Sequence, residues 1–310
     1  MFSAVVIALT LATATATANV SWQSQDPPAL PQEPPATQLE DVVVEGRGLR
    51  DAVDDFVDEI VAPPVGRGPA RWNRRVCVGV VNFRREAAQA LVDQVSSVAL
   101  QAGLEIGDPG CSPNILIIAT DDAQGLARGL VARNPLVFRP QYSGAARSSE
   151  ALKRFQETGV PVRWWHVSMP TVRGTGLPGV RMPGESPPRI PGEGRLRSPL
   201  QNDLLKAFII IDVNAAAGVD LRRLGDYVGM VALAQIDPEA DASSYDTILN
   251  LFDTPQPPLA LTEWDTSYLA ALYGAELNQR PVNFQAGEIS SSMFRDRRAA
   301  QQAEQPDEDE

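Results

Sequence analysis

A strong strand signal followed by a helix that is apolar on almost every face most limits how this chain can fold. Residues 205–213 read Leu-Lys-Ala-Phe-Ile-Ile-Ile-Asp-Val, an apolar run that predicts a buried strand. Asp220 can cap the helix that follows, Leu221–Ile236. From Tyr227 onward this helix carries few polar residues, so we expect it at the centre of the fold.

The remaining pattern predicts one α+β domain with a mixed sheet and packed helices. The C-terminal helix, 262–273, opens on the capping pattern Thr262-Glu-Trp-Asp265, and a compact apolar turn at 245–252 precedes it. A Gly- and Pro-rich excursion at 171–198 interrupts the domain, which we place at 71–280. Further strands are expected at 75–82, 114–120 and 160–167, and further helices at 85–101, 122–133 and 148–158.

The N-terminus is typical of an exported protein. Residues 1–18 contain a short apolar stretch and end in Ala16-Thr-Ala18, which predicts a signal peptide cleaved after Ala18. We therefore expect a periplasmic or secreted protein with no transmembrane span in the mature chain. A Pro-rich disordered linker is predicted at 19–38, and an acidic segment with a short amphipathic helix at 39–62.

The amphipathic helix, at 49–61, carries its apolar residues on one stripe and acidic residues opposite. The stripe has to pack against something, and the core of the same chain is the simplest partner. The stripe consists of Leu49, Val53, Phe56, Val57 and Ile60.

The negative charge of the chain lies mostly at its ends. The formal net charge is −12; residues 26–59 hold ten acidic and two basic residues, and residues 295–310 hold six and three. We expect 295–310 to be a disordered acidic tail. No cluster of basic residues interleaved with aromatics occurs, so nothing favours a nucleic-acid partner.

Two cysteines, Cys77 and Cys111, lie beside predicted strands. If these strands are neighbours in one sheet, the thiols can approach within disulfide distance and close in an oxidising compartment. Two buried free thiols are the alternative. Neither arrangement favours a catalytic role, because no Cys-x-x-Cys spacing or adjacent histidine is present.

The last third of the chain resembles the metzincin-like branch of the zincin metallopeptidases. The likeness rests on strand 207–213, helix 221–236, the turn Tyr245-Asp-Thr-Ile-Leu-Asn-Leu251, and Leu261-Thr-Glu-Trp-Asp-Thr-Ser-Tyr-Leu-Ala-Ala-Leu-Tyr-Gly274. The whole chain also resembles uncharacterised exported proteins of proteobacteria. The resemblance implies a zincin-like domain with a cleft beside helix 221–236.

The zinc-binding pattern of that family is missing. A zincin needs two histidines one helical turn apart, with a glutamate beside the first. The corresponding positions hold Asp226, Tyr227 and Met230, and no histidine follows His166. We therefore expect no metal and no cofactor. We regard these three residues, together with Trp164 and Trp165, as a vestigial cleft that binds a ligand.

His166 is the single histidine of the chain and lies in Arg163-Trp-Trp-His-Val-Ser168. Alternation along a strand puts Trp164 and His166 on one face. We expect a structural histidine, with a general base partnered by Ser168 or Asp212 as the weak catalytic alternative. The pair Trp164 and Trp165 is a candidate stacking platform for a peptide or sugar, although buried tryptophans are commoner.

Three functional hypotheses follow. The leading one is an exported, non-catalytic zincin-like module that binds a protein or a cell-envelope component. A hydrolase that uses His166 or paired carboxylates is the second. The third is a structural envelope protein whose acidic helix docks on a partner. Asp237, Glu239 and Asp241 hint at calcium, but Pro238 breaks the EF-hand pattern, so we expect a solvated loop.

Overall fold

A computed structural model describes residues 48–64, 66–140, 147–186, 188, 190, 192, 196–278 and 283–304. All of them belong to one unit, Gly46–Glu310, whose class is α+β as expected. The predicted signal peptide at 1–18, the linker at 19–38 and the acidic segment up to residue 47 lie outside the described residues.

A mixed sheet of four strands forms the middle of the described chain. Its order is β1-β2-β4-β3, with β1, β2 and β4 parallel and β3 antiparallel to β4. β3 is therefore an edge strand. The strands are β1 (Val78–Val81), β2 (Ile115–Thr120), β3 (Val162–Val172) and β4 (Leu200–Asp212).

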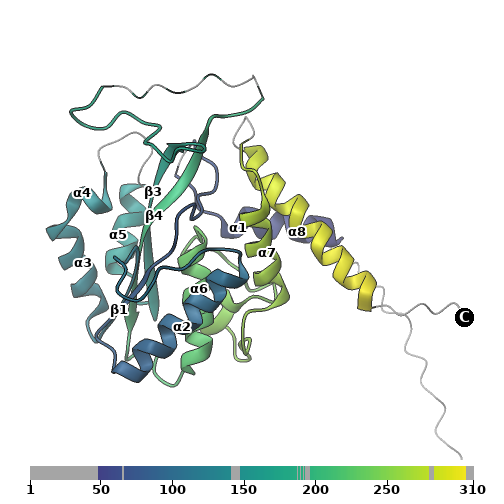
Figure 1. The fold of residues 1–310 in the computed structure, drawn as a ribbon. Helices are drawn as coiled ribbons and strands as arrows, with labels where there is room; N and C mark the ends of the chain where they lie inside the picture. Colours follow the sequence, from purple (N-terminus) through teal and green to yellow (C-terminus); the bar gives the residue numbers. More distant parts are fainter. Residues whose placement is uncertain are drawn as a thin grey trace, which may run out of the picture. The chain divides into compact units, whose positions relative to one another are not determined.

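Helices cover both faces of this sheet (Figure 1). Trp164 and Ile209 face the layer of α2 (Arg85–Gln101) and α6 (Leu221–Leu233). Trp165 and Ile210 face the opposite layer, because neighbouring side chains of a strand alternate. That layer holds α3 (Ala123–Arg133), α4 (Pro135–Phe138) and α5 (Ser149–Glu157).

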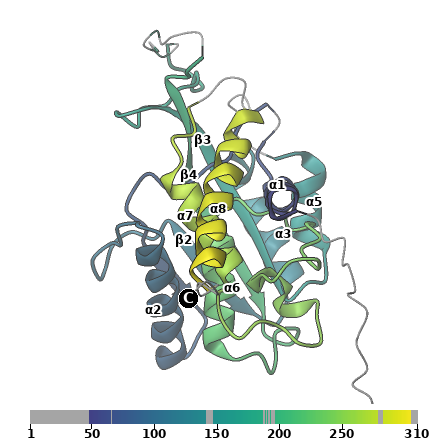
Figure 2. The same ribbon diagram turned by 90° about the vertical axis from the view of Figure 1, so that its right-hand side faces the viewer.

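A further group of helices, drawn from both ends of the described chain, completes the fold (Figure 2). α8 packs against both α7 and α1, so the first and last described helices touch. The elements of this group are α1 (Leu49–Ile60), the 3₁₀ helix η1 (Ile248–Phe252), α7 (Glu263–Gly274) and α8 (Asn283–Glu304).

The helix starts follow the capping signals of the sequence. The Asp220 carboxylate accepts hydrogen bonds from the N–H groups of Arg222 and Arg223, and Asp122 caps α3 in the same way. Thr262 and Asp265 form the expected capping box of α7. Each cap satisfies backbone donors that the first helical turn leaves open.

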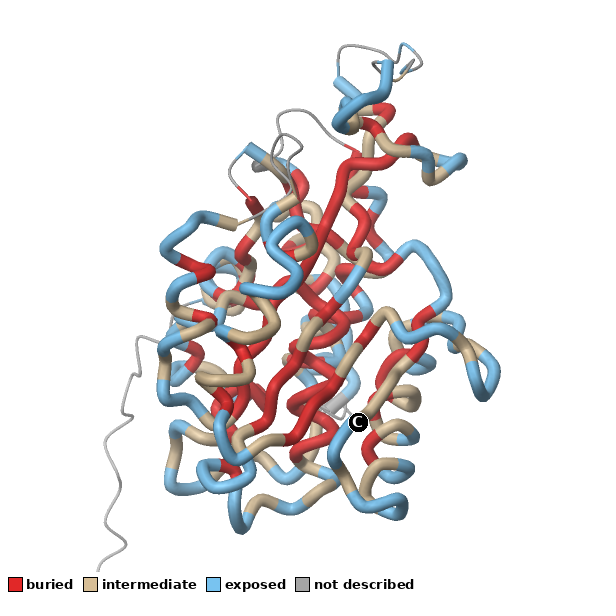
Figure 3. The backbone as a smooth tube through the Cα atoms, turned by 90° about the vertical axis from the view of Figure 1, so that its left-hand side faces the viewer, coloured by how far each residue is buried: buried red, intermediate tan, exposed pale blue. Residues whose placement is uncertain are grey.

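The apolar stripe of α1 packs on the core of the chain itself. Val53, Phe56, Val57 and Ile60 are fully buried, and the Phe56 ring contacts aromatic rings contributed by the 245–268 region. Figure 3 shows that such buried positions run along the strands and the inner helix faces. The hypothesis that this helix docks on a partner is therefore not supported, since its apolar side is occupied.

Two predicted boundaries are wrong at the ends of the domain. Residues 295–304 belong to α8 rather than to a disordered tail, because α8 buries Ile289 and Met293 and continues for several turns beyond them. The domain also extends past the predicted 71–280, since α1 and α8 both contribute to the core.

Two element ends also differ from expectation. β3 continues to Val172, into the predicted 171–198 excursion, because β4 starts at Leu200 and pairs with it. α6 ends at Leu233 rather than 236, because the next residues pair with the end of α1: Ala62 N–H donates to the Gln235 carbonyl, and Asp237 N–H to the Ile60 carbonyl.

Cys77 and Cys111 form a disulfide, with their Cα atoms 6.1 Å apart. The bond ties the chain just before β1 to the loop that leads into β2. None of the described helices combines the length and the apolar character needed to cross a membrane.

The disulfide should stabilise the fold measurably. Replacing both cysteines by alanine is expected to lower the free energy of unfolding by about 3 to 4 kcal/mol, because the bond closes a loop of 34 residues in the unfolded chain. Urea unfolding of the wild type and the double variant measures this, and a reductant should affect the wild type alone. Equal stability of the two proteins would contradict the expectation.

α1 should be part of the cooperative fold. Phe56→Ala is expected to cost about 3 to 5 kcal/mol, because the ring is fully buried and contacts three other aromatic rings. Asp51→Ala, on the exposed side of α1, is the matched control and should change stability by less than about 0.5 kcal/mol. A small effect of Phe56→Ala in urea unfolding would show that α1 is dispensable.

Candidate functional site

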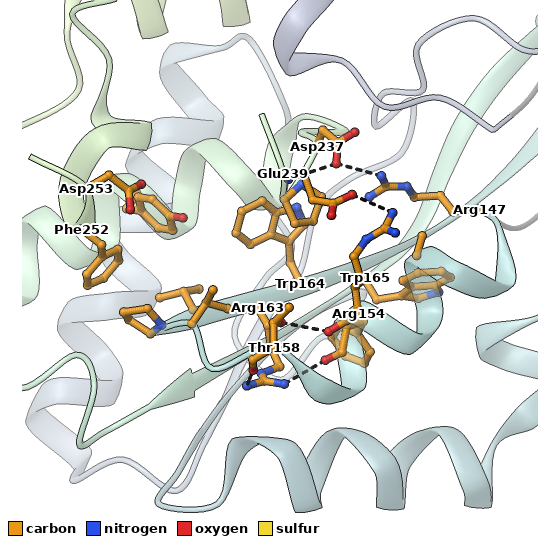
Figure 4. Close-up of a pocket in the computed structure, with 17 residues that line it drawn as sticks. Arg147, Arg154, Thr158, Arg163, Trp164, Trp165, Asp237, Glu239, Phe252 and Asp253 are labelled. Carbon is orange, nitrogen blue, oxygen red and sulfur yellow. Dashed lines mark hydrogen bonds and ion pairs between the residues drawn. The ribbon is translucent and has the colours of Figure 1, made fainter. Parts of the chain in front are cut away.

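A cavity of about 150 Å³ lies at the free edge of β3. Its lining comes from the start of β3, from α5 and the residues beside it, from Tyr227 of α6, and from the segments 237–239 and 252–253. In Figure 4, Phe252 and Asp253 lie at one end of this pocket, Arg147 and Arg154 lie at the other, and Trp164 lies between them.

Three aromatic rings form the apolar part of the pocket. The Trp164 and Tyr227 ring centroids are 6.1 Å apart, those of Tyr227 and Phe252 are 5.2 Å apart, and both pairs meet edge to face. The Trp164 Nε1–H donates to the Ile236 carbonyl at 3.0 Å, which fixes the indole. The wall is therefore held in place by ring packing and by a buried hydrogen bond.

The Tyr227 hydroxyl is an unused polar group in this wall. The residue is only 7% exposed, yet its hydroxyl makes no hydrogen bond to any residue that the structure describes. Burial, and the negative charge of Asp253, raise the pKa of Tyr227 well above its usual 10, so the phenol stays neutral. A neutral hydroxyl can both donate and accept a hydrogen bond.

Two ion pairs form the opposite end of the pocket. Arg147 Nη2 lies 2.9 Å from Asp237 Oδ1, and Arg154 Nη2 lies 2.6 Å from Glu239 Oε2. The Asp237 carboxylate also accepts a hydrogen bond from the N–H of Glu239. Both pairs join the α5 side to the segment after α6, so the two arginines are neutralised where they meet the pocket (Figure 4).

The backbone of β3 presents open hydrogen-bonding groups beside this pocket. The Asp212 N–H donates to the Pro161 carbonyl at 2.9 Å, which identifies the hydrogen-bonded pairs of the β3–β4 ladder. By alternation, the N–H and C=O of Val162 and Trp164 point away from β4. In the described chain these groups have no backbone partner. β3 is nevertheless buried along its whole length, with Val162 and Trp164 only 3% and 6% exposed, so another strand can pair here only after the segments that cover the edge move aside.

His166 lies in the core and not in the pocket. It shares the Trp164 face of β3, as expected, and its Nε2 is 2.8 Å from the Val231 carbonyl. Because a carbonyl oxygen only accepts, Nε2 carries the proton. Burial is the main cause that lowers the His166 pKa to about 4, and the charge of Arg147 adds to it.

Asp212, a candidate catalytic partner of His166, lies far from it, while Ser168 is buried two residues further along β3. His166 pairs with Ala207 in the sheet, five residues along β4 from Asp212, which is about 17 Å at the rise of a strand. The Asp212 carboxylate accepts the N–H groups of Asn214 and Ala215 instead. The geometry therefore favours the structural role for His166.

Of the three α6 residues of the predicted vestigial cleft, one reaches the pocket. Tyr227 lines the pocket, but Asp226 lies on the α2 side, where it accepts a hydrogen bond from Gln94 Nε2 at 2.6 Å. Met230 is fully buried in the core. Trp164 and Trp165 both contact the pocket lining but project from opposite faces of β3, so they form no continuous stacking platform.

Sequence reasoning missed most of the other lining residues. Arg147, Arg154, Phe252 and Asp253 carry no local motif, since they meet only through tertiary packing. Asp237 and Glu239 were noted as a calcium hint, but their carboxylates bind arginines, and Asp241 accepts a hydrogen bond from Ser243. In the residues described, no group of three or more His, Cys, Asp or Glu side chains could hold a metal ion.

Comparison with known proteins found no matching family model, no similar curated protein and no similar solved structure.

The buried imidazole should make the fold sensitive to acid. The folded pKa of about 4 lies below the usual 6.5, so the unfolded chain binds more protons between these values. Stability should therefore be fully present above pH 6.5 and fall by at most about 3 kcal/mol as the pH drops to 4.

His166→Gln is the matched variant, because glutamine can still donate to the Val231 carbonyl but does not titrate. Urea unfolding at pH 4, 5, 6 and 7 should show a smaller loss of stability in this variant than in the wild type. Parallel pH profiles would contradict a neutral buried His166.

Proposed function

We propose that the protein is an extracytoplasmic binding module that holds an extended segment of a partner protein along the free edge of β3. The observation that carries the proposal is the row of outward backbone groups at Val162 and Trp164 beside an aromatic pocket. A bound segment would displace what covers this buried edge, pair with it and place one side chain in the pocket, as in other complexes formed by strand addition.

An extracytoplasmic location is supported by the disulfide between Cys77 and Cys111, since such bonds persist in oxidising compartments. The signal-like sequence at 1–18 points the same way. A cell-envelope protein or a secreted protein is accordingly the expected source of the bound segment.

We further propose a zincin-like scaffold that works without the chemistry of that family. The order β4, α6, η1 and α7 agrees with the order expected from the resemblance. In the register of that resemblance, Asp226, Tyr227 and Met230 stand where the zinc ligands and a general base would, and none of them is a histidine or a glutamate. This supports binding rather than peptide hydrolysis.

Neither alternative function gains support from a specific observation. A hydrolase based on His166 lacks a nearby Asp212, and the carboxylates of Asp237 and Glu239 are bound to arginines. A structural protein that docks through α1 would need the apolar stripe that the core already covers.

The test begins with a display library of random heptapeptides, selected against the full chain without residues 1–18. A peptide that binds is then synthesised with N-methyl groups on alternate amides, and again with the methyl groups shifted by one residue. Strand addition predicts that one set weakens binding about tenfold or more per amide, since each methyl removes a hydrogen bond to β3.

The shifted set is the control and should change the dissociation constant less than threefold, because its amides point away from β3. Equal effects of the two sets would contradict strand addition. Failure of the library to yield any binder would contradict the proposed function itself.

A further inference from the structure

We propose that the pocket beside β3 selects a lysine or arginine side chain of the bound segment. This inference rests on the proposed function, because the side chain is delivered by a segment paired with the β3 edge. It goes further in naming the chemical class that the pocket recognises.

The size of the pocket suits one long side chain. Its volume is about 150 Å³, and a cavity of that size in a protein core can admit a group as large as benzene. A lysine or arginine side chain has a volume of this order, and its aliphatic part can lie against the apolar walls while the charged end reaches further in. A whole peptide does not fit, so the pocket reads a single position.

The walls favour a cation over a neutral apolar group. Trp164, Tyr227 and Phe252 line the same pocket, and aromatic faces attract an ammonium or a guanidinium group through their quadrupoles. The attraction is stronger where water is excluded, and Trp164 and Tyr227 are both more than nine-tenths buried.

The polar groups at the aromatic end are acceptors without a partner. The Tyr227 hydroxyl makes no hydrogen bond in the described chain, and the residue as a whole is 7% exposed. Asp253, which lies at this end in Figure 4, acts electrostatically on Tyr227, and its carboxylate has no described cation beside it. A basic side chain would donate to both the Tyr227 hydroxyl and the Asp253 carboxylate.

The arginines of the lining do not oppose this preference. Arg147 and Arg154 are paired with Asp237 and Glu239 at the far end. Arg163 is buried and projects from β3 on the side opposite to Trp164, where its guanidinium donates to the Phe155 and Thr158 carbonyls. Asp253 is thus the lining carboxylate that no described arginine pairs with, while Arg163 is held by backbone carbonyls alone.

The experiment uses the heptapeptide selected by the full chain. We expect a lysine or arginine at a position whose replacement by norleucine, which keeps the length but not the charge, weakens binding at least tenfold. Replacement by glutamate should weaken it further. Fluorescence anisotropy of the labelled peptide measures the dissociation constants.

Two protein variants locate the effect. Asp253→Asn should weaken binding of the basic peptide about fivefold and Tyr227→Phe by about three- to tenfold, and neither should change binding of the norleucine peptide by more than twofold. Asp296→Asn removes an exposed carboxylate on α8 and is the matched control, with no change expected for either peptide.

The outcomes separate this inference from the proposed function. A peptide that binds through alternate amides but without a basic residue, or that tolerates norleucine, overturns the preference and leaves strand addition standing. A preference for the glutamate peptide overturns it as well. A library without binders overturns both.

Discussion

The close approach of α6 to α2 determines where everything around the pocket lies. A Cβ atom placed on Gly225 would come within 2.7 Å of the Gln94 side chain, and one on Gly229 within 2.9 Å of the Val98 side chain. Any larger residue at these positions would push the two helices apart. Because α6 sits this deep, the side opposite to the glycines, which carries Tyr227, reaches the edge of β3.

A buried carboxylate helps to position the other wall of the pocket. Asp265 is fully buried in α7 and accepts the N–H groups of Thr262 and Ile248, each at 2.8 Å, as well as the Thr247 hydroxyl. The same carboxylate therefore caps one helix and anchors the start of η1. Since η1 ends at Phe252, the capping box indirectly places the aromatic and acidic end of the pocket.

The sequence reveals the parts of this arrangement that depend on local patterns. The apolar run of β4, the caps Asp122 and Asp220, and the capping box at Thr262 are all found where short-range physics predicts them. The sequence pattern does not predict α8, because its sequence is mostly polar and the buried Ile289 and Met293 are isolated within it. The pocket is not predicted for a different reason. Its walls come from segments about 100 residues apart, and no local periodicity indicates that these segments are in contact.

The contact between α1 and α8 has a consequence for how the chain reaches its native state. Arg50 of α1 donates to the Ser291 hydroxyl and lies 5.4 Å from the centroid of the Phe294 ring, across a separation of 241 residues for the hydrogen bond. The core beneath α1 thus stays incomplete until the chain as far as α8 is available. Contacts of such long range slow folding, because a large loop must close before they form. A ribosome that still holds α8 would therefore delay the packing of α1 onto the core.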